Sequence, residues 1–151
     1  RERPLIFNTI QLYRHDRLQF LKDSHERAKL GGYFYAVKLV RGAYMEKERE
    51  RAEEMNYPSP IQPDKAASDR DYDRAVRYCV ENIETIAFVN GSHNEGSIQL
   101  MADLLEEKGV ARNHPHAYFS QLYGMSDNLS YVLAKNGYNV CKYVPYGPVK
   151  D

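Results

Sequence analysis

The stretch Tyr33-Phe34-Tyr35-Ala36-Val37-Lys38-Leu39-Val40-Arg41-Gly42 predicts a short strand whose end turns polar. Its brevity and its aromatic and β-branched residues favour a strand over a helix. Four other apolar runs have the same character, and they cover residues 5–12, 85–89, 117–122 and 140–144. We therefore expect five strands.

Segments with helical spacing of apolar residues separate these runs. They extend from Asp16 to Gly31-Gly32, over the apolar face between Tyr72 and Ile83, from Asn94 to Gly109, and from Ser126 or Asp127 to Asn136-Gly137. Asp, Asn and Ser suit helix starts and glycine suits helix ends. Residues 45–68 form an insertion with a solvated helix turn at 46–51. The alternation of strands and helices predicts a parallel sheet with right-handed crossovers.

Two α/β architectures accommodate this pattern, an open doubly wound sheet and a piece of a (β/α)₈ barrel. The first strand-to-helix turn, Tyr13-Arg14-His15-Asp16, contains no glycine, which disfavours a dinucleotide-binding sheet. A complete barrel needs about 250 residues, so a chain of 151 residues has room for about five of the eight strands. We expect parallel βα units that form about five strands of a barrel.

The composition excludes several classes of function. The chain has 21 basic and 21 acidic residues, so no net charge recruits nucleic acid. No apolar run reaches the ~20 residues of a membrane span, and no signal-peptide core follows the first residues, so we expect a chain that is neither membrane-spanning nor secreted. Cys79 and Cys141 are too few for a disulfide framework and fit a reducing compartment.

Polar side chains gather where each predicted strand ends. The carboxyl ends of parallel barrel strands meet on one face, so these side chains are expected to form one site. The clusters are residues 8–11, 38–44, 90–94, 120–125 and 142–147. This convergence is the main physical indication of a site.

Lys38 is the most unusual of these residues, because it lies inside an apolar strand. A buried ammonium is costly without a partner, so it suits a Schiff-base amine or a fixed charge beside an electron-rich ligand. Alternatively, Lys38 lies on an edge strand and extends into solvent. His93 stands at a strand-to-helix turn, where a capping role or a binding role accounts for it equally well.

The other rim residues also have two interpretations. The amides of Gln11 and Gln121 suit a ring with alternating N–H and C=O groups, or they satisfy loop backbone. Gly42 and Gly124 leave room for a flat ligand, or they serve turns. Tyr44, Tyr123, Tyr143 and Tyr146 are expected to wall a small substrate or to pack. His15, His25, His114 and His116 lack metal-ligand spacing, and we expect no metal site.

Four of these segments together resemble the proline dehydrogenase family, in its lysine-bearing, mitochondrial-like branch. They are Lys38–Tyr44, Ser92-His93-Asn94, Gln121–Met125 and residues 142–149, with Asn8-Thr9-Ile10-Gln11 as a fifth. The resemblance implies a distorted (β/α)₈ barrel that holds FAD. It also implies oxidation of proline to 1-pyrroline-5-carboxylate, with electrons passed to a membrane quinone.

The resemblance also implies roles for individual residues. Lys38 would lie against the flavin N5 and, with Tyr143, carry the catalytic role. The cofactor would be bound by Gln11, Lys38, Val40, Arg41, Gly42, Ser92, His93, Asn94 and Gln121. The proline ring would lie between Leu39, Tyr44 and Tyr143.

The chain departs from the family pattern at both ends. The family's last helix carries an arginine pair for the proline carboxylate, and the sequence ends at Asp151, before that pattern. Early strands with a substrate-side lysine and an aspartate are also absent. Asp64 stands near a position where relatives often have a cofactor-contacting threonine. Residues 1–151 are therefore expected to be an internal piece of the barrel, without the first strands and the last helix.

Three interpretations of function follow. The first is a proline dehydrogenase at the cytoplasmic side of a bacterial inner membrane or in a mitochondrion, with proline and a quinone as partners. The second is an inactive flavin-binding module, or one that associates with itself through exposed sheet edges. A weaker third is a Schiff-base aldolase that uses Lys38.

Overall fold

The computed structural model describes residues 4–145 and residue 147. Tyr146, Pro148 and Val149 of the last motif therefore lie outside the described residues. Five strands form one parallel sheet: β1 (Asn8–Gln11), β2 (Tyr35–Val40), β3 (Ile86–Gly91), β4 (Ala117–Leu122) and β5 (Val140–Tyr143). The helices are α1 (Arg17–Leu30), α2 (Met45–Glu54), α3 (Lys65–Glu81), α4 (Glu95–Glu107) and α5 (Asp127–Lys135).

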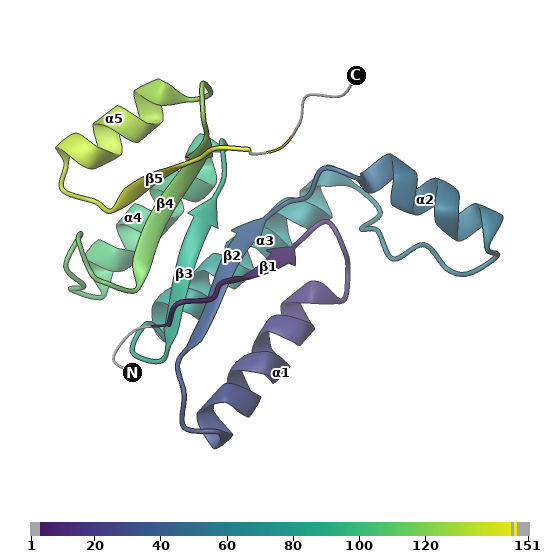
Figure 1. The fold of residues 1–151 in the computed structure, drawn as a ribbon, viewed down its shortest axis with the longest axis horizontal. Helices are drawn as coiled ribbons and strands as arrows, with labels where there is room; N and C mark the ends of the chain where they lie inside the picture. Colours follow the sequence, from purple (N-terminus) through teal and green to yellow (C-terminus); the bar gives the residue numbers. More distant parts are fainter. Residues whose placement is uncertain (1–3, 146, 148–151) are drawn as a thin grey trace.

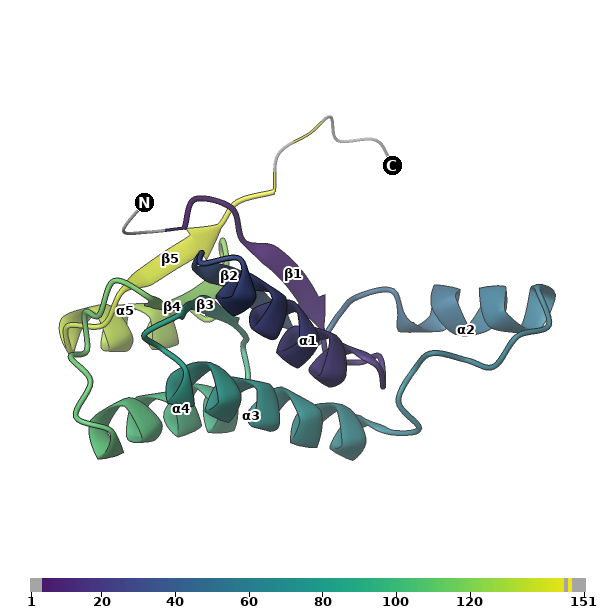
Figure 2. The ribbon, with the colours of Figure 1, turned by 90° about the horizontal axis from the view of Figure 1, so that it is seen from below.

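The order of the strands decides between the two architectures. The order in the sheet is β1-β2-β3-β4-β5, with every neighbouring pair parallel. A doubly wound sheet reverses its strand order and carries helices on both faces. Here α1, α3, α4 and α5 all cover the same face of the sheet (Figures 1 and 2). This is the arrangement of consecutive units in a barrel, as the sequence predicts.

The hydrophobic core lies between the sheet and these helices. Alternate strand residues point toward the helices, as the period of two in a strand requires. The fully buried members include Val37, Leu39, Ile86 and Phe88 from the strands, and Tyr72, Val76, Cys79 and Met101 from α3 and α4. At about 1.5–3 kcal/mol for each large apolar side chain taken out of water, this layer is the main source of stability.

The structure corrects the prediction for Leu39. The resemblance placed it against the proline ring, but the structure places it in this core with an exposed fraction of 0%. Its neighbours Lys38 and Val40 are only partly buried. The reason is the alternation of side chains along β2, which sends residues 38 and 40 to one face and residue 39 to the other.

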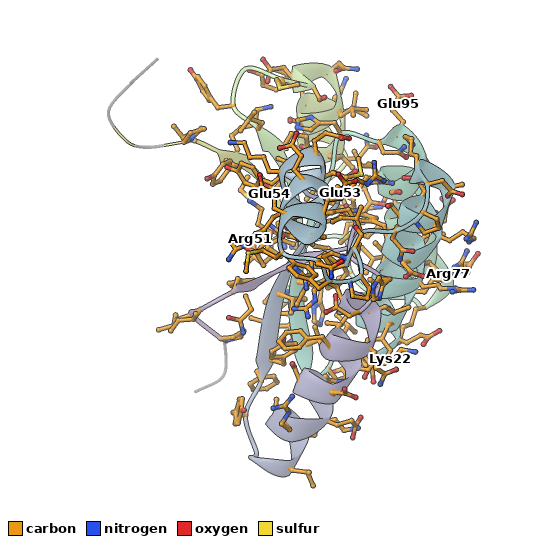
Figure 3. All side chains as sticks on the ribbon, turned by 90° about the vertical axis from the view of Figure 1, so that its right-hand side faces the viewer. Lys22, Arg51, Glu53, Glu54, Arg77 and Glu95 are labelled. Carbon is orange, nitrogen blue, oxygen red and sulfur yellow. The ribbon has the colours of Figure 1, made fainter. Side chains whose placement is uncertain are left out.

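The insertion after β2 contains more helix than its sequence indicates. The expected helix turn is the ten-residue helix α2, and α3 begins at Lys65, because the side chain of Asp64 accepts a hydrogen bond from the Ala67 N–H at 2.6 Å. Helix α2 projects away from the sheet, and Ala52 is its one buried residue (Figure 1). Charged side chains of α2, among them Arg51, Glu53 and Glu54, point outward in Figure 3.

The insertion is nevertheless anchored to the body of the fold. Arg14 forms an isolated antiparallel bridge with Ile61 and an ion pair with Glu48 of α2 at 2.9 Å. The N–H of Gln62 donates to the carbonyl of Tyr13 at 2.8 Å. The loop between β1 and α1 therefore holds both ends of the insertion.

The first strand is shorter than predicted. It contains residues 8–11, whereas the apolar run begins at Leu5, which is 72% exposed. Residues 4–7 cross the helix-free face of the sheet, where Pro4 and Phe7 border a cavity with Val89, Tyr118 and Cys141. Apolar composition alone did not distinguish this crossing from a strand.

None of the helices in the described ranges combines the length and the apolar character that crossing a membrane requires. Cys79 is buried and Cys141 is exposed, and both are free thiols.

Candidate active site

The carboxyl ends of all five strands border one pocket, with a volume of about 520 Å³. Ligand pockets in proteins typically measure about 300–1,000 Å³. The pocket is lined by Gln11, Lys38, Val40, Arg41, Gly42, Ala43, Tyr44, Lys65, Gly91, Ser92, His93, Asn94, Ser120, Gln121, Leu122 and Tyr143. Every residue to which the family resemblance gave a role, except Leu39, is in this set.

Lys38 and Tyr143 meet across the open face of the sheet. The Lys38 Nζ lies 4.0 Å from the centroid of the Tyr143 ring, within the range of a cation–π interaction. Two strands separate β2 from β5, and at ~4.8 Å per strand a flat sheet would hold them about 14 Å apart. The two side chains close that distance from one face, and both line the pocket.

Gly91 makes this crossing possible. A Cβ at residue 91 would lie 2.8 Å from the Leu39 carbonyl oxygen and 3.2 Å from the Lys38 Cε. Contacts this short force the neighbouring atoms to move, and the carbonyl belongs to β2 itself. Glycine at the end of β3 therefore gives the lysine its path, a role that the sequence motif did not suggest.

Arg41 is held by the protein on all three of its nitrogens. Its Nε donates to Asp69 at 2.6 Å, and its two terminal nitrogens donate to the hydroxyls of Ser92 and Ser97, each at 3.0 Å. The guanidinium also lies 4.3 Å from the ring centroid of Tyr72. Arg41 thus joins β2 to α3, to α4 and to the loop between β3 and α4.

The charge of Asp69 reflects this network. Burial alone would raise the pKa of Asp69, but hydrogen bonds from Lys65 and Arg41 outweigh it and hold the pKa below the usual range. The Lys65 Nζ lies 2.5 Å from Asp69 and its side chain is 77% exposed. The carboxylate is therefore ionised between two cations, of which Lys65 faces solvent.

The segment Ser92-His93-Asn94 is fixed by a hydrogen bond within the segment and by bonds to α4 and to the loop before α5. The Asn94 side chain caps α4, where it accepts from the Ser97 N–H at 3.0 Å. The Ser92 hydroxyl accepts from the Asn94 N–H at 3.0 Å. His93 reaches the next loop, where its Nδ1 lies 2.8 Å from the Ser126 Oγ. Ser126 occupies the N-cap position of α5, but its side chain makes no cap hydrogen bond.

Gln11 is positioned from the side of the insertion. The hydroxyl of Tyr13 lies 3.1 Å from the Gln11 amide oxygen and also donates to Glu48 of α2. Burial, together with the hydrogen bond to Glu48, raises the pKa of Tyr13 to about 12. The phenol therefore stays protonated at neutral pH, and it can donate its single proton to Glu48 or to the Gln11 amide oxygen, but not to both at once.

Gly42 has its own steric reason. Its φ is +124°, and a Cβ there would lie 1.6 Å from the Tyr13 Cε1. The Tyr13 ring, 3% exposed, lies directly against the Gly42 backbone. Glycine is therefore required here by the fold, and the same residue borders the pocket.

Gln121 has both ends of its amide bonded within the protein. The Ser130 hydroxyl donates to its oxygen at 2.9 Å, and its Nε2 donates to the Ser92 carbonyl at 3.2 Å. With 1% exposure, the side chain connects β4 to α5 and to the loop after β3. One N–H of this amide has no hydrogen-bonding partner among the described residues.

The aromatic rim separates into two groups. Tyr44 and Tyr143 line the pocket and are 57% and 51% exposed, so both rings present apolar surface to a ligand. Tyr123 is 68% exposed and does not line the pocket. Tyr146 lies outside the described residues.

Ala43, Gly91, Ser120 and Leu122 lie in the predicted polar clusters but received no individual role, whereas Lys65 lies outside every cluster. Ser120, Gln121 and Leu122 are consecutive and all line the pocket, so the period of two along β4 does not distinguish them. Leu122 adds an aliphatic residue to the pocket lining. No pattern in the sequence indicated Lys65, because the folding of the insertion brings this residue to the pocket.

Within residues 4–145 and 147, no group of three or more His, Cys, Asp or Glu side chains is arranged to hold a metal ion. His116 is buried, with its Nδ1 2.7 Å from the carbonyl oxygen of Ile83.

Comparisons with known proteins identify the family to which this chain is similar. A sequence profile described as "Proline dehydrogenase" matches residues 1–151. The human protein "Proline dehydrogenase 1, mitochondrial" is 40% identical over 153 residues, which is 99% of this chain and 26% of the human protein. The "Hydroxyproline dehydrogenase" of Xenopus laevis is 37% identical and covers 97% of this chain and 32% of its own.

Solved structures show the same fold. The crystal structure of proline utilization A (PutA) from Bdellovibrio bacteriovorus inactivated by N-propargylglycine has a TM-score of 0.87 and 30% sequence identity. The match covers 93% of this chain and 14% of that protein. The chain spans about a quarter to a third of the two curated relatives named above.

Proposed function

This chain belongs to the proline dehydrogenase family, and on that premise we propose that its pocket is part of the FAD and proline site of a proline dehydrogenase. The observation that carries the proposal is the meeting of Lys38 and Tyr143 in a pocket that also contains Gln11 and His93. These side chains come from different strands or from the loops that follow them, and the fold gathers them at one rim.

The chemistry of the lining fits a flavin. The ring of a flavin is flat and carries alternating hydrogen-bond donors and acceptors, which the Gln11 amide and the remaining N–H of Gln121 can meet. The Lys38 ammonium suits the electron-rich edge of the ring, and the pocket volume of about 520 Å³ accommodates a ring system. Lys65 supplies an exposed cation at the same rim for a phosphate group.

In this proposal Arg41, Gln121 and Asn94 act mainly by holding the rim. Arg41 has bonds to Asp69, Ser92 and Ser97 on all its nitrogens, so it meets a cofactor with the edge of a guanidinium that is already fixed. A rim that is fixed before binding loses little conformational freedom when the ligand arrives. Val40, Gly42 and Ser92 then contribute backbone and small side chains at the pocket surface.

The substrate would lie against Tyr44, Tyr143 and Leu122. These side chains offer two exposed aromatic rings and an aliphatic wall to a small saturated ring. The bound flavin would supply the two-electron chemistry, and the protein would exclude water and orient the substrate carbon. The Lys38 ammonium would stabilise negative charge that develops beside it.

The rest of the assignment rests on family membership. We propose that residues 1–151 supply about five strands of one barrel domain, with a quinone as the electron acceptor. The location in this proposal is the cytoplasmic side of a bacterial inner membrane or the mitochondrion, and the human relative is named as mitochondrial. We propose proline rather than hydroxyproline as the substrate, because several relatives are named proline dehydrogenase.

The absorbance spectrum of the purified protein tests the cofactor assignment. We expect flavin bands in the visible range after incubation with FAD and gel filtration, and bleaching when proline is added to the longer protein that contains this chain. Lys38→Ala should slow the bleaching by about 10²-fold or more, in line with the loss of one electrostatic contact to developing charge. Lys135→Ala, on the exposed end of α5, serves as the matched control. Reduction at the wild-type rate in Lys38→Ala would remove Lys38 from the mechanism.

A second candidate is a flavin-binding or self-associating module without activity. In the described sheet β1 and β5 each pair with one strand, which leaves two edges for association. Equilibrium sedimentation with and without FAD distinguishes this candidate. A folded monomer that takes up no FAD would contradict both flavin binding and association through the edges.

A further inference from the structure

Ser126, in the loop between β4 and α5, has an unusual backbone. Its φ is 51° and its ψ is 41°, in the left-handed region that residues with a side chain seldom adopt. For a residue other than glycine this conformation costs about 1–2 kcal/mol. A serine at an N-cap position typically has extended backbone and caps the helix with its hydroxyl, but Ser126 is left-handed and its hydroxyl does not cap α5.

The hydroxyl bonds His93 instead. The Ser126 Oγ lies 2.8 Å from the His93 Nδ1, and the Leu122 N–H donates to the His93 Nε2 at 3.4 Å. A backbone N–H can only donate, so Nε2 is the acceptor. The neutral ring then carries its proton on Nδ1 and donates it to Ser126. The contacts with Leu122, at the end of β4, and with Ser126, in the loop that follows, therefore fix both the tautomer and the plane of the ring.

These contacts matter because His93 has little other support. Its side chain is exposed at the mouth of the pocket, and it lines the pocket beside Gln121 and Leu122. The preceding residue, Ser92, is buried and held by Arg41, whereas the imidazole extends beyond that network. Without Ser126, only the long 3.4 Å contact with the Leu122 N–H would remain among the described residues, and the ring could rotate away from it.

We propose that Ser126 is a positioning residue that holds His93 in the Nδ1–H tautomer at the mouth of the pocket. The left-handed backbone at residue 126 aims the hydroxyl at His93 rather than at the end of α5. The consequence for FAD binding rests on the proposed function, because it requires that His93 contact the cofactor. The contact between Ser126 and His93 itself does not depend on that function.

Two substitutions separate the hydroxyl from the backbone. Ser126→Ala removes the hydroxyl and keeps the strained conformation, whereas Ser126→Gly removes the hydroxyl and relieves the strain. If residue 126 serves only to turn the chain, Ser126→Gly should behave like the wild type or better. If the hydroxyl positions His93, both variants should lose the same property. Asn128→Ala, exposed near the start of α5, is the matched control.

The first readout is the tautomer of His93 in the purified chain without flavin, measured by ¹⁵N NMR of labelled histidine. The signal is assigned by its loss in His93→Gln. We expect Nδ1–H in the wild type and in Asn128→Ala, and a shift toward Nε2–H in both Ser126 variants. A wild-type signal of the Nε2–H form, or an unchanged tautomer in both Ser126 variants, would overturn the proposal.

The second readout is the affinity for FAD, measured by quenching of flavin fluorescence. A net hydrogen bond contributes about 0.5–1.5 kcal/mol, so both Ser126 variants should bind FAD about 2- to 12-fold more weakly than the wild type. Wild-type affinity in Ser126→Gly with weakened affinity in Ser126→Ala would overturn the positioning role. If the wild type binds no FAD, the proposed function fails, while the NMR comparison still decides whether Ser126 holds His93.

Discussion

The helix-covered face and the open face of the sheet are built from alternate residues of the same strands. On the covered face, Leu39 and Phe88 are fully buried among α3 and its neighbours. On the open face, Lys38 and Tyr143 are partly exposed and touch each other across the pocket. One residue along the chain thus separates a side chain that stabilises the fold from one that lines the site.

The difference between the two faces shows how a small fold keeps a polar site without losing its core. The polar groups at the rim are bonded to the protein before any ligand arrives, as Arg41 and Gln121 illustrate. Burying a polar group without a partner is costly, so these networks allow the rim to be partly buried. Substitutions on the two faces should therefore differ in kind.

The largest expected effect is at Leu39. Leu39→Ala should lower the free energy of unfolding by about 2–5 kcal/mol, because it leaves a cavity in the core. Lys38→Ala, one residue away, should lower it by less than about 1 kcal/mol, since its partner is an exposed ring. Urea denaturation of both variants measures the contrast. Equal losses in the two variants would refute the separation of the faces.

The next largest loss of stability is expected at the rim, where position 42 requires glycine. Gly42→Ala would place a methyl group 1.6 Å from the Tyr13 ring, and we expect a loss of about 3 kcal/mol from steric strain and the positive φ together. Gly32→Ala is the control, because its φ is +69° and no atom lies within 4 Å of the added methyl group. The control should lose about 1–2 kcal/mol in the same denaturation experiment. A smaller loss at Gly42 than at Gly32 would contradict the packing against Tyr13.

A smaller effect is expected on the pH dependence of stability, and it involves His25 of α1, on the covered side of the sheet. His25 is fully buried, with its Nδ1 2.9 Å from the Tyr78 hydroxyl and its Nε2 2.8 Å from the Thr85 hydroxyl. Burial, and to a lesser extent the charge of Lys29, lowers the pKa of His25. Glu26 acts in the opposite direction.

The sign of the pH effect follows from linkage. Because the folded pKa of His25 lies below its unfolded value of about 6.5, the unfolded chain binds the proton more tightly, so stability falls as the pH drops through and below that value. Denaturation at several pH values between 7 and 5 should show this fall in the wild type and a flatter profile in His25→Gln. Parallel profiles for the two proteins would exclude His25 as the cause.

The smallest expected effect is on the open face, between Lys38 and Tyr143. A double-mutant cycle with Lys38→Met and Tyr143→Leu should give a coupling energy of about 0.5–1 kcal/mol. Tyr143→Phe retains the ring and should keep most of that coupling. No measurable coupling in the cycle would mean that the two side chains do not hold each other in solution.

Much of the fold and the pocket followed from local patterns. Apolar runs bounded by turn residues indicated the strands, and Asn94 was identified as the cap of α4, where its side chain accepts from Ser97. The gathering of Gln11, Lys38, His93 and Tyr143 followed from the rule that parallel strands end at one rim. The prediction that Leu39 contacts the substrate was wrong. It took all residues of the motif as one surface, although adjacent residues of a strand face opposite sides.

The amino-acid sequence was enough to predict the parallel α/β fold and the rim on which polar residues gather, because strand and helix periods and their alternation along the chain are local properties. The tertiary structure decided the contacts between residues far apart in the chain. Lys65 reaches the pocket through the insertion, Gly91 gives Lys38 its path, and Ser126 turns toward His93. These relations depend on the register of neighbouring strands and on loop geometry, which no periodicity encodes.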